Sequence, residues 1–188
     1  MNWTQRRKQK VRRRRVLAVL AVLAIALAGS FLAGILLPVE HVGVGHALLD
    51  RSPETVWRVL TDLDGMPLWR SDLTALERLP NVAGRPAWRE IGRGGARVVE
   101  LTMADPPRRL VIQRAAGGRS VLPIRTFDLD SAATGTRVTI TERGEVRNPL
   151  GRVLVRLRSG APAIDRFLRD LDQRLSAGRR QVAAEGAH

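Results

Sequence analysis

The sequence predicts an α+β protein in which one apolar N-terminal helix precedes a curved antiparallel sheet of about seven strands, wrapped on a long C-terminal helix. Three observations predict this architecture. An uncharged apolar run covers residues 16–37, six segments with period-two alternation follow one another across short turns, and an apolar stripe with helical period lies near the C-terminus. Strands joined by short turns pair antiparallel, and an apolar stripe on a helix needs an apolar surface to cover it.

The apolar run of residues 16–37 has the length of a transmembrane helix. Twenty-two residues in helical geometry rise about 33 Å, close to the thickness of the hydrocarbon core of a bilayer. Residues 1–15 before it carry eight cations and no acid, and by the positive-inside rule such a basic flank stays in the cytoplasm. We therefore expect a single-pass protein of the cell membrane, with a cytoplasmic N-terminus, an extracytoplasmic domain and the lipid bilayer as a partner.

Two other interpretations of this run stay open. Ala26-Leu27-Ala28 before Gly29 is typical of a cleavage site behind a signal peptide, and a buried core helix is also apolar. The run continues past that site to Leu37, which a secretory leader does not require, and a core helix is rarely apolar on every face. An uncleaved membrane anchor is the preferred interpretation.

The rest of the chain is long enough for one domain, which we place at residues 41–176, followed by a flexible tail at 177–188. The first 39 residues hold eight of the 32 basic residues and none of the 18 acidic ones, so the remainder has a formal charge of about +6 rather than the +14 of the whole chain. This charge is modest, and no helix-turn-helix or stacking pattern is present, so no nucleic-acid partner is expected. The oligomeric state is not predicted.

The residue types exclude several kinds of chemistry. The chain has no Cys and only three His, none with a second His at ligand spacing. We therefore expect no cofactor, no metal site and no Ser-His-Asp triad.

Local patterns predict the first strand and two short helices after it. Alternation over residues 41–49 predicts a strand. Ser52 can accept a hydrogen bond from free backbone N–H groups and Pro53 suits the first helical position, so a short helix over 54–61 should follow. A glycine and a proline then turn the chain just before Trp69.

After Trp69, side-chain polarity again alternates with a period of two residues, which predicts a meander of six strands. The connections between them contain Gly or Pro, as tight turns require. Consecutive strands joined so closely pair antiparallel, and the first strand should pair at an edge of the sheet. The predicted strands cover residues 73–79, 87–91, 96–104, 108–115, 121–129 and 136–146.

A long amphipathic helix should end the domain. Asn148 and Pro149 provide a cap and a first-turn proline, and the helical pattern is interrupted around residues 159–162. The apolar stripe that follows must pack on the curved sheet, the one apolar surface large enough to cover it. Its members recur at helical spacing and are Ile164, Phe167, Leu168, Leu171 and Leu175.

Six short segments carry a resemblance to a known fold. They are Ser52-Pro53-Glu54-Thr55-Val56-Trp57, the stretch from Leu63 that ends in Pro67-Leu68-Trp69, Ala87-Trp88-Arg89-Glu90, Arg109-Leu110-Val111, the stretch from Gly135 to Glu142, and Asn148-Pro149. In this order they resemble the helix-grip fold of the START-like superfamily, also called SRPBCC, and its polyketide cyclase/dehydrase-like members, over roughly residues 42–175. The resemblance implies a cavity between the sheet and the C-terminal helix for lipids, sterols, polyketides or other apolar ligands. It implies no single activity.

Strand periodicity places charged side chains on the face of the sheet that would line this cavity. On the last strand Val138 and Ile140 share a face with Glu142. A buried carboxylate needs a partner. Arg125 on the neighbouring strand is the candidate, because it alternates onto the same face of its strand as Phe127. This pair is either a polar anchor for the head group of a ligand or a salt bridge without a ligand role.

Aromatic and apolar side chains complete the predicted site. Trp88 shares a face with Glu90, and Trp69 stands at a helix break, so each either contacts a ligand or belongs to the core. Met103 and the two later phenylalanines are predicted to line the cavity or the core. The predicted ligand-binding residues are Trp69, Trp88, Met103, Arg125, Phe127, Val138, Ile140, Glu142 and Phe167.

The leading functional hypothesis is a membrane-anchored domain that binds a hydrophobic small molecule or lipid, as a carrier or a sensor. The first alternative is a cyclase- or dehydrase-like enzyme, for which Glu90, Glu142 and Asp72 are the acid/base candidates. It predicts that Glu142 or Glu90 lies in an open pocket with a raised pKa. The second is a non-enzymatic envelope scaffold with a vestigial cavity. A cavity of roughly 300 Å³ or more would favour the first two over the scaffold.

Overall fold

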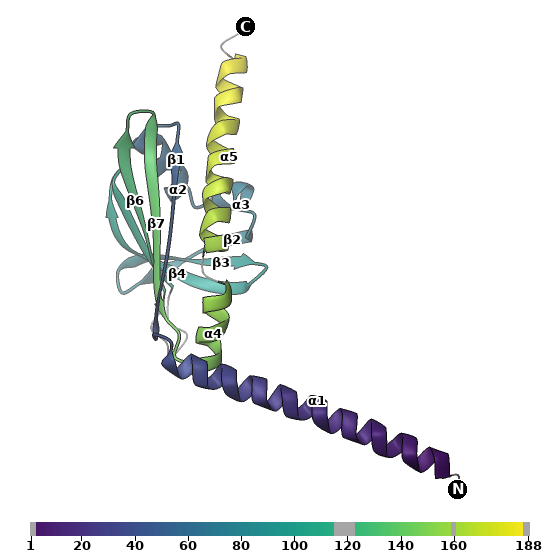
Figure 1. Ribbon diagram of the computed structural model, residues 1–188. Coiled ribbons are helices and arrows are strands. Elements are labelled where there is room, and N and C mark those ends of the chain that lie inside the picture. Colours follow the sequence, from purple (N-terminus) through teal and green to yellow (C-terminus); the bar gives the residue numbers. More distant parts are fainter. Residues whose placement is uncertain (1–2, 115–122, 159–160, 186–188) are drawn as a thin grey trace. The chain divides into compact units, whose positions relative to one another are not determined.

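The computed structural model describes residues 3–114, 123–158 and 161–185 (Figure 1). The chain forms two compact units. The first unit, Met1–Val39 with Val146–Leu157, contains helices α1 (Trp3–Leu36) and α4 (Pro149–Arg158). The second unit, Glu40–Glu145 with Arg158–His188, contains the sheet and the remaining helices.

The second unit is built on one antiparallel sheet of seven strands in the order β1-β7-β6-β5-β4-β3-β2. Each strand from β2 to β7 pairs with the next, which confirms the predicted meander, and β1 pairs with β7 at an edge, as expected. The predicted strand ends at 115 and 121–122 fall outside the described residues. The strands are β1 (Glu40–Leu49), β2 (Leu73–Val82), β3 (Arg85–Gly92), β4 (Gly95–Asp105), β5 (Arg109–Arg114), β6 (Ile124–Ala132) and β7 (Gly135–Glu145).

Two short helices, α2 (Pro53–Thr61) and α3 (Met66–Trp69), follow β1. The Ser52 Oγ accepts a hydrogen bond from the Thr55 backbone N–H at an N···O distance of 3.4 Å, which is the cap that the sequence predicted. The inward face of α2 buries Val56 and Leu60 completely.

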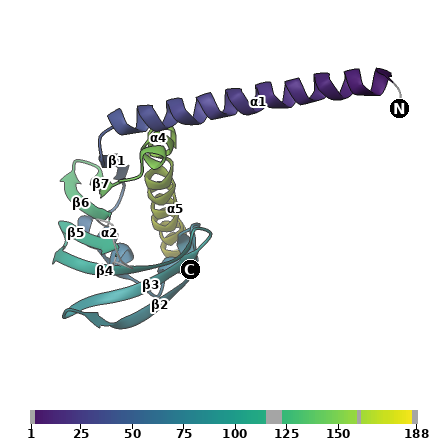
Figure 2. The ribbon, with the colours of Figure 1, turned by 90° about the horizontal axis from the view of Figure 1, so that it is seen from below.

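Helix α5 (Ala161–Glu185) lies against the concave face of the sheet, which curves around it (Figure 2). All five members of the predicted apolar stripe are buried. They pack on inward-facing residues of α2 and of the sheet, and at Gly45 a Cβ would collide with the Ile164 side chain, so this glycine permits close approach of the helix to β1. The helix continues to Glu185, where a flexible tail was predicted from residue 177, because alanine favours helix and one glycine at 178 costs only about 1 kcal/mol.

The first unit contains the apolar N-terminal helix. Within α1, the segment Arg15–Leu36 is 22 residues long and apolar enough to cross a membrane or to serve as a signal sequence. Its large apolar side chains are exposed, so in the part of the chain that the structure describes it is not a core helix.

Helix α4 packs against the last turn of α1. A Cβ at Gly34 would collide with the Pro149 carbonyl, so only glycine permits this approach. The Arg152 Nη1 donates to the carbonyl oxygens of Gly34 at 3.1 Å and Leu37 at 3.3 Å, groups that the end of a helix leaves without a backbone partner. By its contacts α4 groups with α1 in the first unit.

Candidate ligand-binding site

The cross-strand register gathers charged side chains at one end of the concave face. Glu90 on β3 stands opposite Arg97 on β4, and Arg125 on β6 stands opposite Glu142 on β7. Arg114 on β5 pairs with the buried Val99 and therefore points to the same face. Most of the remainder of this face is apolar and belongs to the core that also contains residues of α2 and α5.

A cavity of about 80 Å³ lies on the concave face between the sheet and helices α2, α3 and α5. Its walls are mainly apolar. The volume is below the roughly 300 Å³ that would have favoured a carrier or an enzyme over a scaffold with a vestigial cavity, and the space is large enough only for a small ligand or a short apolar chain. The lining consists of Leu60, Thr61, Leu63, Met66, Arg70, Pro86, Trp88, Glu90, Leu101, Leu110, Ile112, Arg125, Phe127 and Phe167.

A smaller polar cleft of about 30 Å³ adjoins the cavity and shares Glu90, Ile112 and Arg125 with it. We call it the polar cleft. It is also lined by Arg97, Arg114 and Glu142, together with Val99 and Pro123.

One wall of the cavity carries a buried polar group without a partner. Trp88 is 4% exposed, and its indole Nε1 has no hydrogen-bond partner in the part of the chain that the structure describes. A buried N–H group left unpaired costs about 1–3 kcal/mol, and such groups are rare in folded proteins. An acceptor atom that came within hydrogen-bond distance of this N–H group would relieve this cost.

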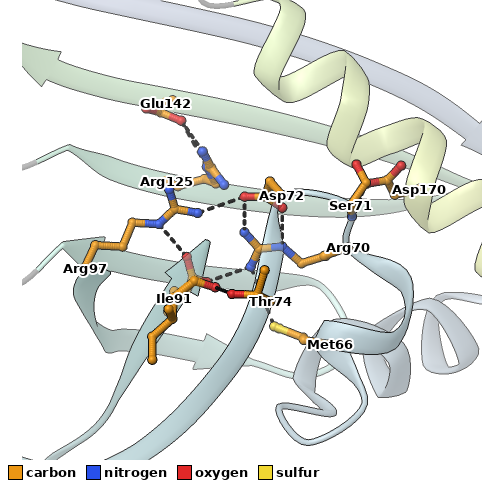
Figure 3. Close-up of polar contacts among 11 residues, drawn as sticks. Met66, Arg70, Ser71, Asp72, Thr74, Ile91, Arg97, Arg125, Glu142 and Asp170 are labelled. Carbon is orange, nitrogen blue, oxygen red and sulfur yellow. Dashed lines mark hydrogen bonds and ion pairs between the residues drawn. The ribbon is translucent and has the colours of Figure 1, made fainter. Parts of the chain in front are cut away.

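Two arginines and two carboxylates form a group of ion pairs that we call the closed cluster: Arg70, Asp72, Glu90 and Arg97. Figure 3 labels Arg70, Asp72 and Arg97. The Arg70 guanidinium, 2% exposed, donates to Glu90 Oε1 at 2.6 Å and to both oxygens of Asp72 at 2.9 and 3.1 Å. Arg97 donates to Glu90 Oε2 at 2.7 Å and to Asp72 Oδ2 at 2.8 Å. Each arginine of the closed cluster thus contacts both carboxylates.

The closed cluster keeps its carboxylates ionised. Burial by itself would raise the pKa of Glu90, but the charges and hydrogen bonds of Arg70 and Arg97 lower it below its usual value. Burial also raises the pKa of Asp72, and Arg70 and Arg97 again lower it below its usual value.

A second group, which we call the open cluster, consists of Arg114, Arg125 and Glu142. The Arg125 Nη2 and Nε donate to one oxygen of Glu142 at 2.5 and 3.0 Å, as the sequence predicted for this pair (Figure 3). Burial would raise the pKa of Glu142, but Arg125, Arg114 and His41 lower it. Among the described residues, the Arg114 guanidinium has no hydrogen bond or ion pair.

Three aromatic rings lie beside the cavity. Phe167 of α5 contacts Trp69 edge to face and Phe127 at a tilt, each with a centroid distance of 5.4 Å. The Arg70 guanidinium lies 5.3 Å from the Phe167 ring centroid. Phe167 thereby connects the aromatic wall with the closed cluster.

The structure brings some of the predicted ligand-binding residues together and separates others. Trp88, Arg125, Phe127 and Phe167 line the cavity, and Glu142 lines the polar cleft. The remaining predicted residues do not line either space. Trp69 packs on Phe167, and Val138 and Ile140 are fully buried in the core beneath α5.

The prediction that Met103 lines the cavity or core is wrong. Its side chain is 53% exposed. The register of β4 against β5 shifts between Leu101 and Met103, so one extra residue enters β4 there. Such a bulge reverses the faces that follow it, and Leu101 lines the cavity while Met103 does not.

Sequence reasoning missed three arginines of the site. Arg97 could have been predicted, because the short Gly-rich turn between β3 and β4 sets Gly92 opposite Gly95 and hence Glu90 opposite Arg97. Arg114 precedes a segment without a clear pattern, and Arg70 lies at a helix break, where no periodicity indicates its direction. The expectation of a raised pKa at Glu90 or Glu142, which the enzyme alternative required, is also wrong.

Solved structures with the same architecture are known at low sequence identity. Protein TTHA0849 from Thermus thermophilus is 21% identical with a TM-score of 0.60, and a START superfamily protein from Mycobacterium smegmatis is 15% identical with a TM-score of 0.59. Each match covers 73% of this chain and 98% of the other. The di-domain ARO/CYC StfQ of the steffimycin biosynthetic pathway is 9% identical with a TM-score of 0.61, over 76% of this chain and 52% of that one.

The family comparison agrees with these structures. No curated protein matches the chain. Residues 45–176 match the family described as polyketide cyclase / dehydrase and lipid transport. The match extends over more than half of the chain and spans the region from β1 to α5. The domain has the START-like fold, and the chain belongs to the polyketide cyclase / dehydrase and lipid transport family.

Proposed function

We propose that this domain binds a small apolar molecule with a hydrogen-bond acceptor in the cavity of its concave face, and that α1 anchors it in a membrane, where it acts as a carrier or a sensor. The observation that carries the ligand proposal is the unpaired indole N–H of Trp88, a residue that lines the mainly apolar cavity. An acceptor oxygen of a ligand would satisfy that donor while its apolar part replaces water against the aromatic rings.

Two features favour binding over the alternatives. The cavity of about 80 Å³ does not reach the roughly 300 Å³ that would favour binding over a scaffold by volume alone, but its interior is not filled by side chains and its lining holds an unpaired donor, the Trp88 indole N–H. An acid–base enzyme needs a proton-transfer group with a pKa near the working pH. Both candidate glutamates instead have a lowered pKa and are held by arginines.

The membrane proposal rests on the exposed apolar segment Arg15–Leu36 and on the end of its helix. Apolar side chains exposed over 22 residues match the length and composition of a segment that crosses a bilayer. The carbonyls of Gly34 and Leu37, where the apolar segment ends, receive hydrogen bonds from Arg152. A cation in this position also interacts favourably with the negative end of the helix dipole.

Extraction of co-purified molecules tests the ligand proposal. The full-length chain is purified in nanodiscs, unfolded, and the released molecules are identified by mass spectrometry against empty nanodiscs. Leu101→Trp fills the cavity, and Met103→Trp places the same ring on the exposed side of the same strand as a matched control. We expect one released molecule with the wild type and with Met103→Trp, and at least a tenfold loss with Leu101→Trp.

A second blocking variant guards against loss of folding. Leu63→Trp introduces the ring from the loop between α2 and α3, where the side chain is only half-buried. Equal yields of the molecule from all four proteins, or from none, would overturn the ligand proposal.

Single cysteines test the membrane proposal, since the chain has none of its own. Arg93→Cys lies exposed in the turn between β3 and β4, and Gln5→Cys lies in the basic flank. In spheroplasts, a membrane-impermeant maleimide should label Arg93→Cys at once and Gln5→Cys only after permeabilisation. The reverse order, or a chain recovered from the soluble fraction without residues 1–28, would contradict an N-in anchor.

A further inference from the structure

The polar cleft contains a guanidinium without an anion. Arg114 lines the cleft, and among the described residues it has no hydrogen bond or ion pair. The segment that follows it, residues 115–122, contains an arginine and no Asp or Glu, so it has no carboxylate side chain to offer. Arg125 is directed to Glu142, and Arg97 to the closed cluster.

The charges around the cavity and the cleft do not balance. The closed and open clusters together hold four guanidinium groups, those of Arg70, Arg97, Arg114 and Arg125. They hold three carboxylates, those of Asp72, Glu90 and Glu142. The excess is one positive charge, and it lies at Arg114 because the other three arginines each contact a carboxylate.

The surroundings of Arg114 disfavour its charge. Arg114 is exposed to solvent at the cleft mouth, but partial burial of its guanidinium lowers its pKa, and the positive charges of Arg97 and Arg125 lower it further against the opposing effect of Glu142 and Glu90. Four other cleft-lining groups thus act on this guanidinium, two of each sign. A bound anion would stabilise it in the way that Glu142 stabilises Arg125.

The cavity and the cleft are suited to the two ends of one molecule. They share Glu90, Ile112 and Arg125, so a ligand with its apolar part against Phe127 and Trp88 can extend past Ile112 into the cleft. The cleft measures about 30 Å³, which suits a compact anionic group. A single excess charge favours a monoanion over a dianionic phosphate.

We propose that the ligand is an apolar monocarboxylate, whose carboxylate is bound by Arg114 beside the Arg125–Glu142 pair. This inference rests on the function proposed above, because it needs the cavity to hold the apolar part. Guanidinium and carboxylate form bidentate, charge-assisted hydrogen bonds, which are about twice as strong as neutral ones. Glu142 excludes a second negative charge from the cleft, so dicarboxylates should bind more weakly.

Two sources can supply such an acid: free aromatic or short-chain acids in solution, and fatty acids in the bilayer. A matched pair of probes represents each source. The full-length chain in nanodiscs is titrated with 4-phenylbutyrate and with 4-phenyl-1-butanol, and nanodiscs are separately loaded with dodecanoate or 1-dodecanol. Binding is measured by calorimetry for the soluble pair and by native mass spectrometry for the lipid pair.

The variants replace one arginine at a time. Arg114→Gln removes the proposed anchor, Arg114→Lys keeps the charge but not the bidentate geometry, and Arg143→Gln removes an exposed charge from the opposite face of β7 as a matched control. We expect the acid of at least one pair to bind about tenfold more tightly than its alcohol, a difference of about 1.4 kcal/mol. This preference should vanish in Arg114→Gln, recover in part in Arg114→Lys and persist in Arg143→Gln.

Each outcome bears on a different proposal. Preference in the soluble pair assigns the ligand to solution, and preference in the lipid pair assigns it to the bilayer. Acid and alcohol binding equally in all variants would overturn the carboxylate inference and leave the binding function standing. If neither probe of either pair binds the wild type, the cavity does not serve as a ligand site and both proposals fall.

Discussion

The closed and open clusters differ in how their charges are satisfied, although they lie on the same face of one sheet. In the closed cluster, two arginines and two carboxylates contact one another in every combination, and Arg70 and Glu90 are almost completely buried. In the open cluster, Arg125 and Glu142 form one pair, with side chains 22% and 28% exposed, and Arg114 has no partner among the described residues.

This difference indicates two roles for charge on one surface. Arg70 follows α3, whereas Glu90 and Arg97 belong to β3 and β4, so the closed cluster connects a helix to the sheet. A buried network whose members are all paired makes the local structure specific. A cluster with an unpaired, exposed cation contributes little stability and retains capacity for an external anion.

The largest expected effect is the loss of Arg70. Arg70→Ala leaves Glu90 buried with one partner instead of two, and breaking a buried ion pair typically costs about 3–5 kcal/mol. We expect the free energy of unfolding to fall by about 3 kcal/mol, measured by urea denaturation of the full-length chain in detergent. Replacing both partners by apolar residues, as Arg70→Met with Glu90→Leu, should recover at least half of this loss.

The contribution of the closed cluster to stability should decrease as the pH is lowered. The pKa of Glu90 in the folded state lies below its usual value of 4.5. Its ion pairs therefore contribute stability that is fully present above about pH 4.5 and is lost as the pH falls through the folded-state pKa. Glu90→Gln should be less stable than the wild type at pH 6, and this deficit should shrink toward pH 3. A deficit that stays constant with pH would show that Glu90 contributes through packing rather than charge.

The smallest effect on stability is expected in the open cluster. Glu142→Gln removes one partly exposed pair, and such pairs contribute about 0–1 kcal/mol. The same change frees Arg125 and raises the positive charge of the polar cleft, so the affinity for 4-phenylbutyrate should rise several-fold. Calorimetry on the full-length chain measures the affinity. A loss of more than 2 kcal/mol in stability would remove the distinction between the two clusters.

Much of the fold was predictable because it follows from local patterns. The meander follows from tight turns between period-two segments, and the stripe from Ile164 to Leu175 faces the sheet because a helix of that pattern has one apolar side. The Arg125–Glu142 pair was predictable from the alternation of side chains along each strand alone, since no β-bulge interrupts the pairing of β6 with β7.

The rest of the fold and of the site depends on features that the periodicity of apolar residues does not indicate. A single extra residue in β4 turned Met103 outward. Arg70 enters the site from a helix end, where backbone direction rather than spacing decides its position. The cavity volume depends on how side chains from α2, β3 and α5 meet, and Val138 and Ile140 became core because α5 covers them.

The most direct test of ligand binding on the concave face uses the indole N–H signals of the tryptophans. The chain has four, Trp3, Trp57, Trp69 and Trp88, so the ¹⁵N-labelled full-length chain in nanodiscs gives few indole signals, and Trp88→Phe assigns one of them. At saturating 4-phenylbutyrate, or with dodecanoate in the nanodisc, we expect the Trp88 N–H signal to move downfield as its proton gains an acceptor, while Trp57 stays in place. An unchanged Trp88 signal with a ligand demonstrably bound would place that ligand elsewhere and contradict the account.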